Sequence, residues 1–442
     1  MNSINRRDFL KTSALGLGGL ATGFSAKSYG NIMGANDRVH VAIMGCGRRV
    51  GAFYDSFEDS YNSELLYICD VKKNMRERVA ADLDSRLPYS PKVIEDIREA
   101  FDDDELDAVI VATPDHWHAP AGWMAMEAGK HVFIEKPLTH NPAENEYLTQ
   151  FQNKYNRVLQ MGNQQRSSLH TIEIIDEIHN GVIGRPYKAT AFYNNDRGRV
   201  PNPVQQDPPS DLNWDLFQGP APRESYRHNT WDYYWHWYGW KWGTAEAGNN
   251  ALHELDVARW ALQLGYPEKV QVVANKNHFL DDGWEMYDTM YASFIYSDEQ
   301  VINWDCESRN NFNTYDGGRG TIIFGTEGTV FIDRSLYRLY DRSGNLMRAR
   351  ASAEREGGTG LGGGGGMSTD HVINFYNAIR GKEQPNSPTE EAVISTQLCH
   401  LANIAYRVNK SFEVDTSNGR ILDDEAMKYW GREYEPGWEP KI

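Results

Sequence analysis

The sequence is poor in basic residues relative to acidic ones, and it holds few cysteines. Its 45 Lys and Arg against 62 Asp and Glu give a formal net charge of −17. That charge argues against nucleic acid or an acidic membrane surface as a partner. The four cysteines, at positions 46, 69, 306 and 399, show neither metal-ligand spacing nor a paired pattern. We therefore expect no metal site and no disulfide framework.

The apolar run near the N-terminus is too short to cross a membrane. It extends from Ala14 to Phe24, is rich in Gly and Ala, and follows the segment Asn5–Lys11, which matches a twin-arginine signal. The small residues Ser25 and Ala26 offer a cleavage site. We predict that residues 1–33 are a twin-arginine signal peptide and linker. The protein would then be exported to the periplasm, with no stable membrane span after signal removal.

A strand, a glycine-rich turn and a carboxylate together predict a dinucleotide site. The apolar run 39–44 is typical of a buried parallel strand, and glycines follow at positions 45, 47 and 51. Glycine lets a pyrophosphate approach such a turn, where the N–H groups that open the next helix face the phosphates. The spacing is one residue longer than in the usual fingerprint. Asp70 ends the next apolar run at the distance where a carboxylate bonds the ribose 2′-OH, which favours NAD over NADP.

Short apolar runs alternate with helix-forming stretches from residue 34 to residue 160. This alternation predicts a doubly wound parallel sheet, a Rossmann domain, whose ligands lie beyond the carboxyl ends of the strands. Two segments follow such strand ends, Thr113–His118 and Glu135-Lys136-Pro137. Lysine beside a nicotinamide can hold a sugar hydroxyl and lower its pKa. The predicted cofactor-binding residues are Gly45, Cys46, Gly47, Arg48, Arg49, Asp70, Thr113, Pro114, His116, His118, Glu135 and Lys136.

The glycine turn, the Thr-Pro-Asp-His-Trp-His segment at 113–118 and Glu135-Lys136-Pro137 together resemble the Gfo/Idh/MocA superfamily. That superfamily includes glucose–fructose oxidoreductases and inositol dehydrogenases. The resemblance implies that Lys136 contacts the reacting hydroxyl and that Pro137 shapes the turn, often through a cis bond. It also implies that residues 161–442 form an α+β substrate domain on an open, mostly antiparallel sheet. Such sheets commonly pair between subunits, so we expect a homo-oligomer.

Candidate substrate residues lie in this second region. The family carries Asp-x-x-x-His here, with the histidine acting as acid and base. His253 matches the histidine, whereas Asn249 replaces the aspartate and can only orient a hydroxyl. The aromatic stretch 231–242 is either a wall of the substrate or oligomer surface or a packed satellite core, since Trp and Tyr rings stack on sugars as well as in cores. The predicted catalytic residues are Lys136 and His253, and the predicted substrate-binding residues are Asn249, Asp256, Trp235, His236 and His371.

These features predict an exported, NAD-dependent oxidoreductase that acts on a sugar, glycoside or polyol. Free NAD is scarce outside the cytoplasm, so we expect the nicotinamide to be tightly bound and not exchanged at each turnover. The alternative is an NAD-dependent glycosidase, a type that the superfamily also contains. Such enzymes oxidise the C3 hydroxyl transiently, eliminate the aglycone, add water and reduce the sugar again.

Overall fold

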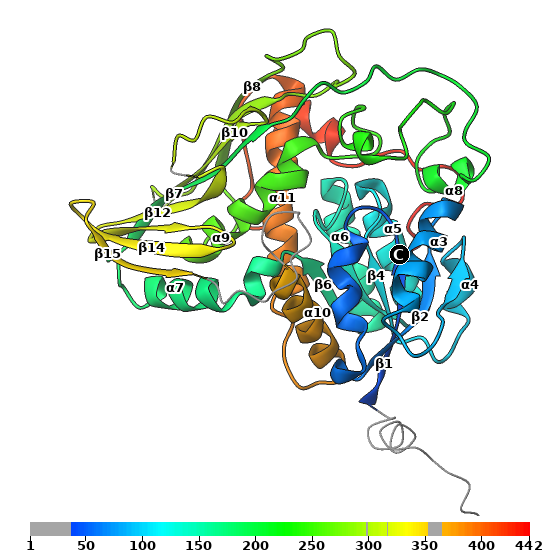
Figure 1. The fold of residues 1–442 in the computed structure, drawn as a ribbon. Coiled ribbons are helices and arrows are strands. Elements are labelled where there is room, and N and C mark those ends of the chain that lie inside the picture. The colour runs from blue at the N-terminus through cyan, green and yellow to red at the C-terminus, as the bar shows by residue number, and fades with distance from the viewer. Residues whose placement is uncertain (1–36, 298, 316, 352–364) are drawn as a thin grey trace, which may run out of the picture. The chain divides into compact units, whose positions relative to one another are not determined.

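The computed structural model describes residues 37–297, 299–315, 317–351 and 365–442. The predicted signal peptide and linker, residues 1–33, lie outside the described residues. Residues 39–442 form one unit, and Figure 1 shows its two sheets with helices packed on each.

The first sheet consists of six parallel strands. Its spatial order, β3-β2-β1-β4-β5-β6, is that of a doubly wound nucleotide-binding sheet and confirms the predicted Rossmann fold. The three-residue strand β3 was not predicted, because two of its three side chains are exposed and it shows no apolar run. The strands are β1 (Val39–Met44), β2 (Ser63–Cys69), β3 (Lys92–Ile94), β4 (Ala108–Val111), β5 (His131–Glu135) and β6 (Leu159–Gly162).

Both faces of this sheet are covered, which is why its strands are apolar on both sides. In β1, Val41 and Ile43 pack in one core cluster and Ala42 and Met44 in the other. The helical segment predicted after the glycine turn is the 3₁₀ helix η2. The helical segments of this half are η2 (Val50–Phe57), η3 (Asp59–Tyr61), α3 (Lys73–Asp84), α4 (Arg98–Phe101), η4 (Asp115–Trp117), α5 (His118–Glu127) and α6 (Pro142–Tyr155).

The second sheet is open and mostly antiparallel, as predicted. Its order is β15-β14-β13-β12-β7-β10-β9-β8-β16, only β7 and β10 pair in parallel, and β11 pairs with β7 off this path. The outer side chains Val273 and Tyr291 remain 69% and 48% exposed. The strands are β7 (Pro186–Asp196), β8 (Lys269–Asn275), β9 (Thr289–Ile295), β10 (Val301–Glu307), β11 (Arg309–Asn310), β12 (Arg319–Gly325), β13 (Gly328–Ile332), β14 (Leu336–Asp341), β15 (Leu346–Ala351) and β16 (Phe412–Glu413).

Helices tie the second sheet to the first. Helices α9 and α11 pack on the inner face of the second sheet, and α11 also contacts α6 and β6 (Figure 1). Helix α10 returns to the first sheet, where Val372 and Phe375 join the core cluster of Val41 and Ile43. The remaining helical segments are η5 (Gln164–Ser167), α7 (Leu169–His179), α8 (Trp214–Gln218), η6 (Tyr233–His236), the π-helical turn η7 (Ala247–Ala251), α9 (Leu252–Leu262), α10 (Gly365–Ile379), α11 (Thr389–Val408) and η8 (Ala426–Tyr429).

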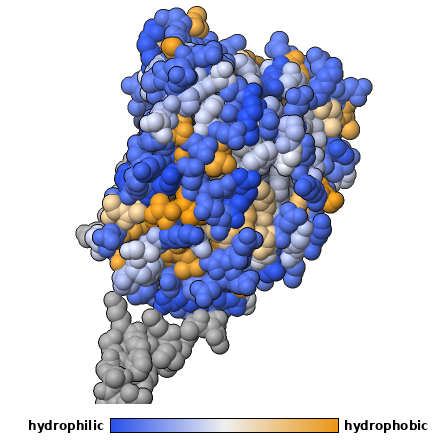
Figure 2. Space-filling view, turned by 90° about the vertical axis from the view of Figure 1, so that its right-hand side faces the viewer, coloured by the Kyte–Doolittle hydropathy of each residue, from blue (hydrophilic) through white to orange (hydrophobic). Residues whose placement is uncertain are grey.

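The surface agrees with the acidic, polar composition. Figure 2 shows a mainly hydrophilic face on the side of the first sheet, with apolar residues gathered in its lower part and scattered singly elsewhere. None of the helices formed by the described residues combines the length and the apolar character that a membrane span needs.

Candidate active site

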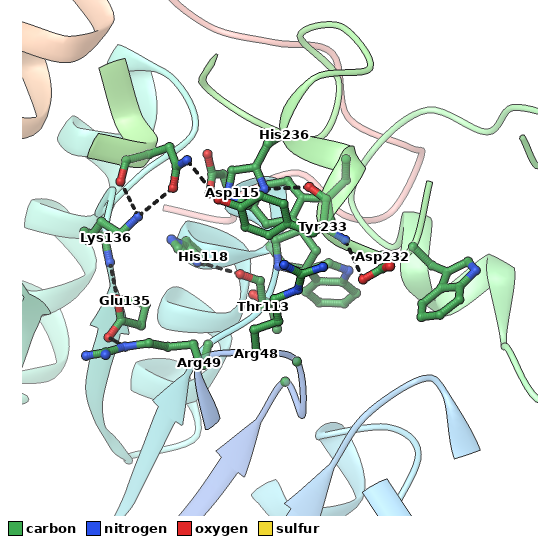
Figure 3. Close-up of a pocket in the computed structure, with 18 of the residues that line it drawn as sticks. Arg48, Arg49, Thr113, Asp115, His118, Glu135, Lys136, Asp232, Tyr233 and His236 are labelled. Atoms are coloured by element: carbon green, nitrogen blue, oxygen red, sulfur yellow. Dashed lines mark hydrogen bonds and ion pairs between the residues drawn. The ribbon is translucent and has the colours of Figure 1, made fainter. Parts of the chain in front are cut away.

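A cavity of about 850 Å³ lies at the carboxyl ends of the first sheet and is closed by residues of the second half. The glycine turn and the ends of β2, β4 and β5 supply one wall. The other wall comes from the end of β7, from α9 with its preceding turn, and from the hairpin between β13 and β14. Figure 3 shows Glu135 and Lys136 on one side of this cavity and Tyr233 and Asp232 on the other.

The glycine turn is shaped by close backbone contacts. Gly45 has a φ of +102°, and a Cβ there would lie 2.5 Å from the carbonyl oxygen of Ala112, so only glycine fits. The carboxylate of Asp70 holds the turn, because its Oδ2 accepts from the N–H of Cys46 at 2.6 Å. Its Oδ1 accepts from the N–H of Lys72 at 2.8 Å. Burial raises the pKa of Asp70, and the two N–H donors offset part of that effect.

The residues at this turn fit a dinucleotide. A Cβ on Gly47 would meet nothing within 4 Å, so the space above it is open to a ligand. Among the described residues, Thr113 Oγ1 is buried at the cavity without a hydrogen-bond partner. Asp70 keeps lone pairs beyond the two that it uses in the turn, which leaves it able to accept from a hydroxyl. The cavity thus contains a cradle, a hydroxyl without a partner and a carboxylate that can accept from a ligand.

Lys136 joins the two walls of the cavity. Its Nζ donates to the carbonyl oxygen of Asn249 at 2.6 Å and to the Asn249 Oδ1 at 3.3 Å (Figure 3). The preceding Glu135 forms an ion pair with Arg49, whose Nε lies 2.7 Å from Oε1. Burial lowers the pKa of Lys136, whereas Glu135 and Asp115 act in the opposite direction. The Lys136–Pro137 bond is cis, as the family resemblance implies.

His253 lines the same cavity as Lys136 and follows the π-helical turn η7. This turn packs closely on the first half. A Cβ on Gly248 would collide with Thr244 Oγ1 and would lie 3.1 Å from Pro137. Among the described residues, the His253 ring has no hydrogen-bond partner, and burial followed by the charge of Arg334 holds its pKa well below 6.5. His253 is therefore a neutral imidazole at pH 7 that can accept a proton from a ligand.

The aromatic stretch 231–242 divides between the two expected roles. Its first part lines the cavity, where the rings of Trp235 and His236 stack with centroids 3.6 Å apart. His236 Nδ1 donates to the carbonyl oxygen of Tyr233 at 2.9 Å, which leaves Nε2 as an acceptor. Its later part is core, because Trp237 and Trp242 are fully buried.

The long loop between β7 and η7, residues 197–245, crosses the end of the cavity at Asp70. Its Asn213 N–H donates to the carbonyl oxygen of Val71 at 2.9 Å. Lys72 forms an ion pair with Asp211 at 3.1 Å, and its Nζ lies 3.9 Å from the centre of the Trp231 ring. The loop is thus fixed to the residues that directly follow Asp70.

Four residues assigned from the sequence are not brought to the cavity lining. The Cys46 side chain is buried, its Sγ donates to the carbonyl oxygen of Cys69 at 3.6 Å, and its N–H donates to Asp70. His116 Nε2 donates to the carbonyl oxygen of Phe217 at 2.8 Å, and burial lowers its pKa to about 3. His371 packs between Ser167 Oγ and the carbonyl oxygen of Met161. Each of these side chains is buried and bonds to protein groups, although His116 Nδ1 has no partner among the described residues.

Asp256 is the fourth, and it is an internal counter-ion. Its two carboxylate oxygens each accept from Arg166 at 2.8 Å, in a bidentate pair that is buried on both sides. Burial alone would raise the pKa of Asp256, but the Arg166 guanidinium more than offsets it and the pKa is lowered. The i, i+3 spacing from His253 therefore does not place Asp256 at the substrate.

The cavity also contains charged residues that sequence reasoning missed. Arg334 and Arg319 come from the second sheet, and Arg197 follows β7. Arg319 pairs with Glu254 at 2.7 Å, and Arg197 pairs with Glu246 at 2.6 Å. No motif marks these residues, because charged side chains at strand ends and hairpins usually face water.

Residues 39–163 match the model of the Gfo/Idh/MocA oxidoreductases, described as an oxidoreductase family with an NAD-binding Rossmann fold. This part of the chain belongs to that family. The match covers the glycine turn, Asp70, Glu135 and Lys136, which all line one wall of the cavity.

Individual relatives are more distant. A glycosyl hydrolase family 109 protein of Shewanella putrefaciens is 26% identical over 213 residues, which span 44% of this chain and 46% of that relative. An aldose–aldose oxidoreductase of Caulobacter crescentus, solved with glycerol, superposes with a TM-score of 0.63 at 18% identity over 85% of this chain and 100% of its own. The WlbA dehydrogenase of Bordetella pertussis, solved with NADH and UDP-GlcNAcA, superposes with a TM-score of 0.62 at 18% identity. The superposition covers 86% of this chain and 99% of that one. These structural likenesses concern the fold.

Proposed function

We propose that this protein is an NAD-dependent oxidoreductase that acts on a hydroxyl-bearing carbon of a sugar, glycoside or polyol. The observation that carries the proposal is one continuous cavity, which contains Gly47 and Asp70 together with Lys136 and His253. A nicotinamide bound there would supply the acceptor for a hydride. The chain's own groups would hold the substrate hydroxyl and take up its proton.

Lys136 and His253 divide that work between them. The ammonium group of Lys136 is fixed by Asn249 and can donate a further hydrogen bond to the substrate hydroxyl, which stabilises the developing alkoxide. The neutral His253 ring accepts the proton, since burial and nearby cations keep it unprotonated. Asn249 donates from Nδ2 to the Tyr233 hydroxyl at 3.4 Å and serves to position Lys136.

The 197–245 loop supports retention of the cofactor through many turnovers. Its contacts with Val71 and Lys72, and the placement of Trp231 in the cavity lining, close the end at Asp70. A nucleotide in this cavity would leave only after the loop had detached from the β2 end. Retention also fits export in a folded, loaded state, which we propose on the strength of the twin-arginine signal.

A redox-neutral glycosidase is the second candidate, and the glycosyl hydrolase family 109 relatives favour it. The same Lys136 and His253 would then manage the substrate proton, and the hydride would return to the sugar. Because the match covers less than half of each protein, it supports this candidate less strongly than the cavity supports the first.

One experiment tests the proposal and separates the candidates. Purified, undialysed protein is mixed with candidate sugars and, separately, with aryl glycosides, without added NAD. A rise of the reduced-nicotinamide absorbance supports the oxidoreductase, and release of the aryl group supports the glycosidase. The Lys136→Met variant serves as the control, and we expect it to keep the nucleotide without giving either signal. The proposal fails if no nucleotide binds, or if neither signal appears with any sugar or glycoside when NAD is added.

A further inference from the structure

Arg334 projects into the cavity from the hairpin between β13 and β14, on a turn that is held from both sides. Asp333 Oδ1 accepts from the N–H groups of Ser335 at 2.7 Å and Leu336 at 2.9 Å. The carbonyl oxygen of Asp333 accepts from Gln165 Nε2 at 3.2 Å. The turn is thus fixed independently of the Arg334 side chain, which lines the cavity and is free to meet a ligand.

Arg334 differs from Arg49, Arg319 and Arg197, which also line the cavity, because no carboxylate of the described residues pairs with it. Arg49, Arg319 and Arg197 each pair with a glutamate at 2.6–2.7 Å. Within the described part of the chain, Arg334 forms neither an ion pair nor a hydrogen bond. Burial, together with the neighbouring Arg319, lowers its pKa to about 9. Arg334 is half-buried, and the carboxylates of Glu254 and Glu135 offset only part of the effect of burial and Arg319 on its pKa. An anion bound beside the guanidinium would therefore stabilise it.

The position of Arg334 favours the substrate over the cofactor as the source of this anion. Arg334 comes from the second sheet, and of all charges in the cavity it acts most strongly on His253. The phosphate cradle at Gly45 and Gly47 lies on the opposite wall, in the first half of the chain, and Arg48 belongs to that turn. Arg334 therefore acts on the imidazole that, in the proposed function, takes the substrate proton.

Resting on the proposed function, we propose that the natural substrate is an anionic sugar, a uronate or a sugar phosphate, whose charged group is bound by the guanidinium of Arg334. The planar fork of arginine matches both kinds of oxyanion. A neutral sugar would leave Arg334 without a counter-ion in the closed complex, so the cavity discriminates against it. Arg334 is thus a specificity-determining residue, separate from Lys136 and His253.

Binding and turnover with three probes test this proposal, namely D-glucuronate, D-glucose 6-phosphate and D-glucose. Wild type is compared with Arg334→Met and with the control Arg342→Met, which removes an exposed arginine of the neighbouring hairpin outside the cavity. We expect one of the two anionic probes to raise the melting temperature of wild type more than glucose does. Arg334→Met should weaken that binding about 10- to 100-fold, as for a lost charge-assisted hydrogen bond. The affinity of Arg334→Met for NAD should equal that of wild type. Arg342→Met should bind both the anionic probe and NAD as wild type does.

The probes also identify the anion and separate the two proposals. Preference for glucuronate indicates a carboxylate, and preference for glucose 6-phosphate indicates a phosphate. If glucose binds as tightly as both anions, or if Arg334→Met loses NAD instead of the sugar, the inference is overturned while the oxidoreductase proposal stands. If Arg334-dependent anion binding occurs but neither hydride transfer nor glycoside cleavage is found with any sugar, the proposed function fails and the anion site remains.

Discussion

Lys136 Nζ donates to the carbonyl oxygen of Asn249 at 2.6 Å, across 113 residues of sequence. This bond connects the carboxyl end of β5 to the π-helical turn that precedes His253. It places the ammonium group and the imidazole in one cavity, although they come from opposite halves of the chain. The proposed chemistry depends on that connection.

Replacing Lys136 by Met should abolish most of the catalysis without removing the cofactor. The variant keeps an unbranched side chain of nearly the same length but loses the charge that would hold the substrate hydroxyl. We expect kcat to fall by about 10²- to 10⁴-fold, the range for loss of a proton-handling group. Nucleotide content, measured after denaturation of the purified protein, should equal that of wild type. Full turnover by Lys136→Met would show that Lys136 is not catalytic.

Two glycine variants should distinguish the contribution of the turn to stability from its contribution to nucleotide binding. Gly45→Ala forces a Cβ against the Ala112 carbonyl oxygen in a left-handed conformation, so we expect a loss of about 1–3 kcal/mol in stability. Gly47→Ala meets no protein atom and should leave the unfolding midpoint unchanged. It should nevertheless weaken nucleotide binding, because the methyl group occupies the open space of the cradle. Equal nucleotide affinity in Gly47→Ala and wild type would contradict the proposed cofactor position.

The pH dependence of kcat/KM should reflect the ionisation of His253 and Lys136. Because burial and Arg334 lower the pKa of His253, the acid limb of kcat/KM should lie below pH 6.5. Burial also lowers the pKa of Lys136 from 10.5, so the alkaline limb should begin below that value if the ammonium form is required. Arg334→Met removes a charge that disfavours the imidazolium, and the acid limb should move to higher pH. If the acid limb stays in place in Arg334→Met, as it should in the control Arg342→Met, then the charge of Arg334 does not set the pKa of His253.

Asp256→Asn should destabilise the protein while leaving the chemistry of the folded enzyme largely intact. It breaks the bidentate pair with the buried Arg166, which keeps only Glu391 at 3.5 Å, and breaking such a buried pair typically costs about 3–5 kcal/mol. The folded pKa of Asp256 is lowered, so its contribution is present above the unfolded pKa of about 3.9 and is lost as pH falls through the folded value. The difference between variant and wild type should therefore shrink at strongly acidic pH. The exposed Asp281→Asn, which breaks the surface pair with Arg199, is the control and should show no such change.

Trp231→Ala should loosen the cofactor. The ring lines the cavity and packs on Lys72, so its removal detaches part of the 197–245 loop from the β2 end. We expect nucleotide to be lost during gel filtration, as followed by absorbance, and activity to return when NAD is added. Trp240→Ala, outside the cavity and packed near Tyr406, should retain its nucleotide. If both variants retain their nucleotide, the contact of the 197–245 loop at Trp231 is not what holds the cofactor.

Much of the fold and one wall of the site were predictable from local pattern. The strand 39–44, the glycines after it and Asp70 lie within 32 residues, from Val39 to Asp70, and their spacing alone indicates the turn. Glu135-Lys136-Pro137 is likewise recognisable as a contiguous motif. Strand β3 and the 3₁₀ character of η2 were not predicted, because a short exposed strand and the type of a helix produce little hydrophobic periodicity in the sequence.

The residues of the opposite wall could not be predicted from the sequence, because their contacts form only in the folded chain. Asp256 and Arg334 are both charged residues whose partners lie far away in sequence, and spacing says nothing about which partner each will meet. Packing placed Arg166 against Asp256, which makes Asp256 internal, and left Arg334 facing the cavity without a carboxylate. Local backbone preferences specify a turn or a strand because they act over a few residues. The electrostatic character of the cavity depends on contacts between distant segments, and these form only when the two sheets and α11 come together.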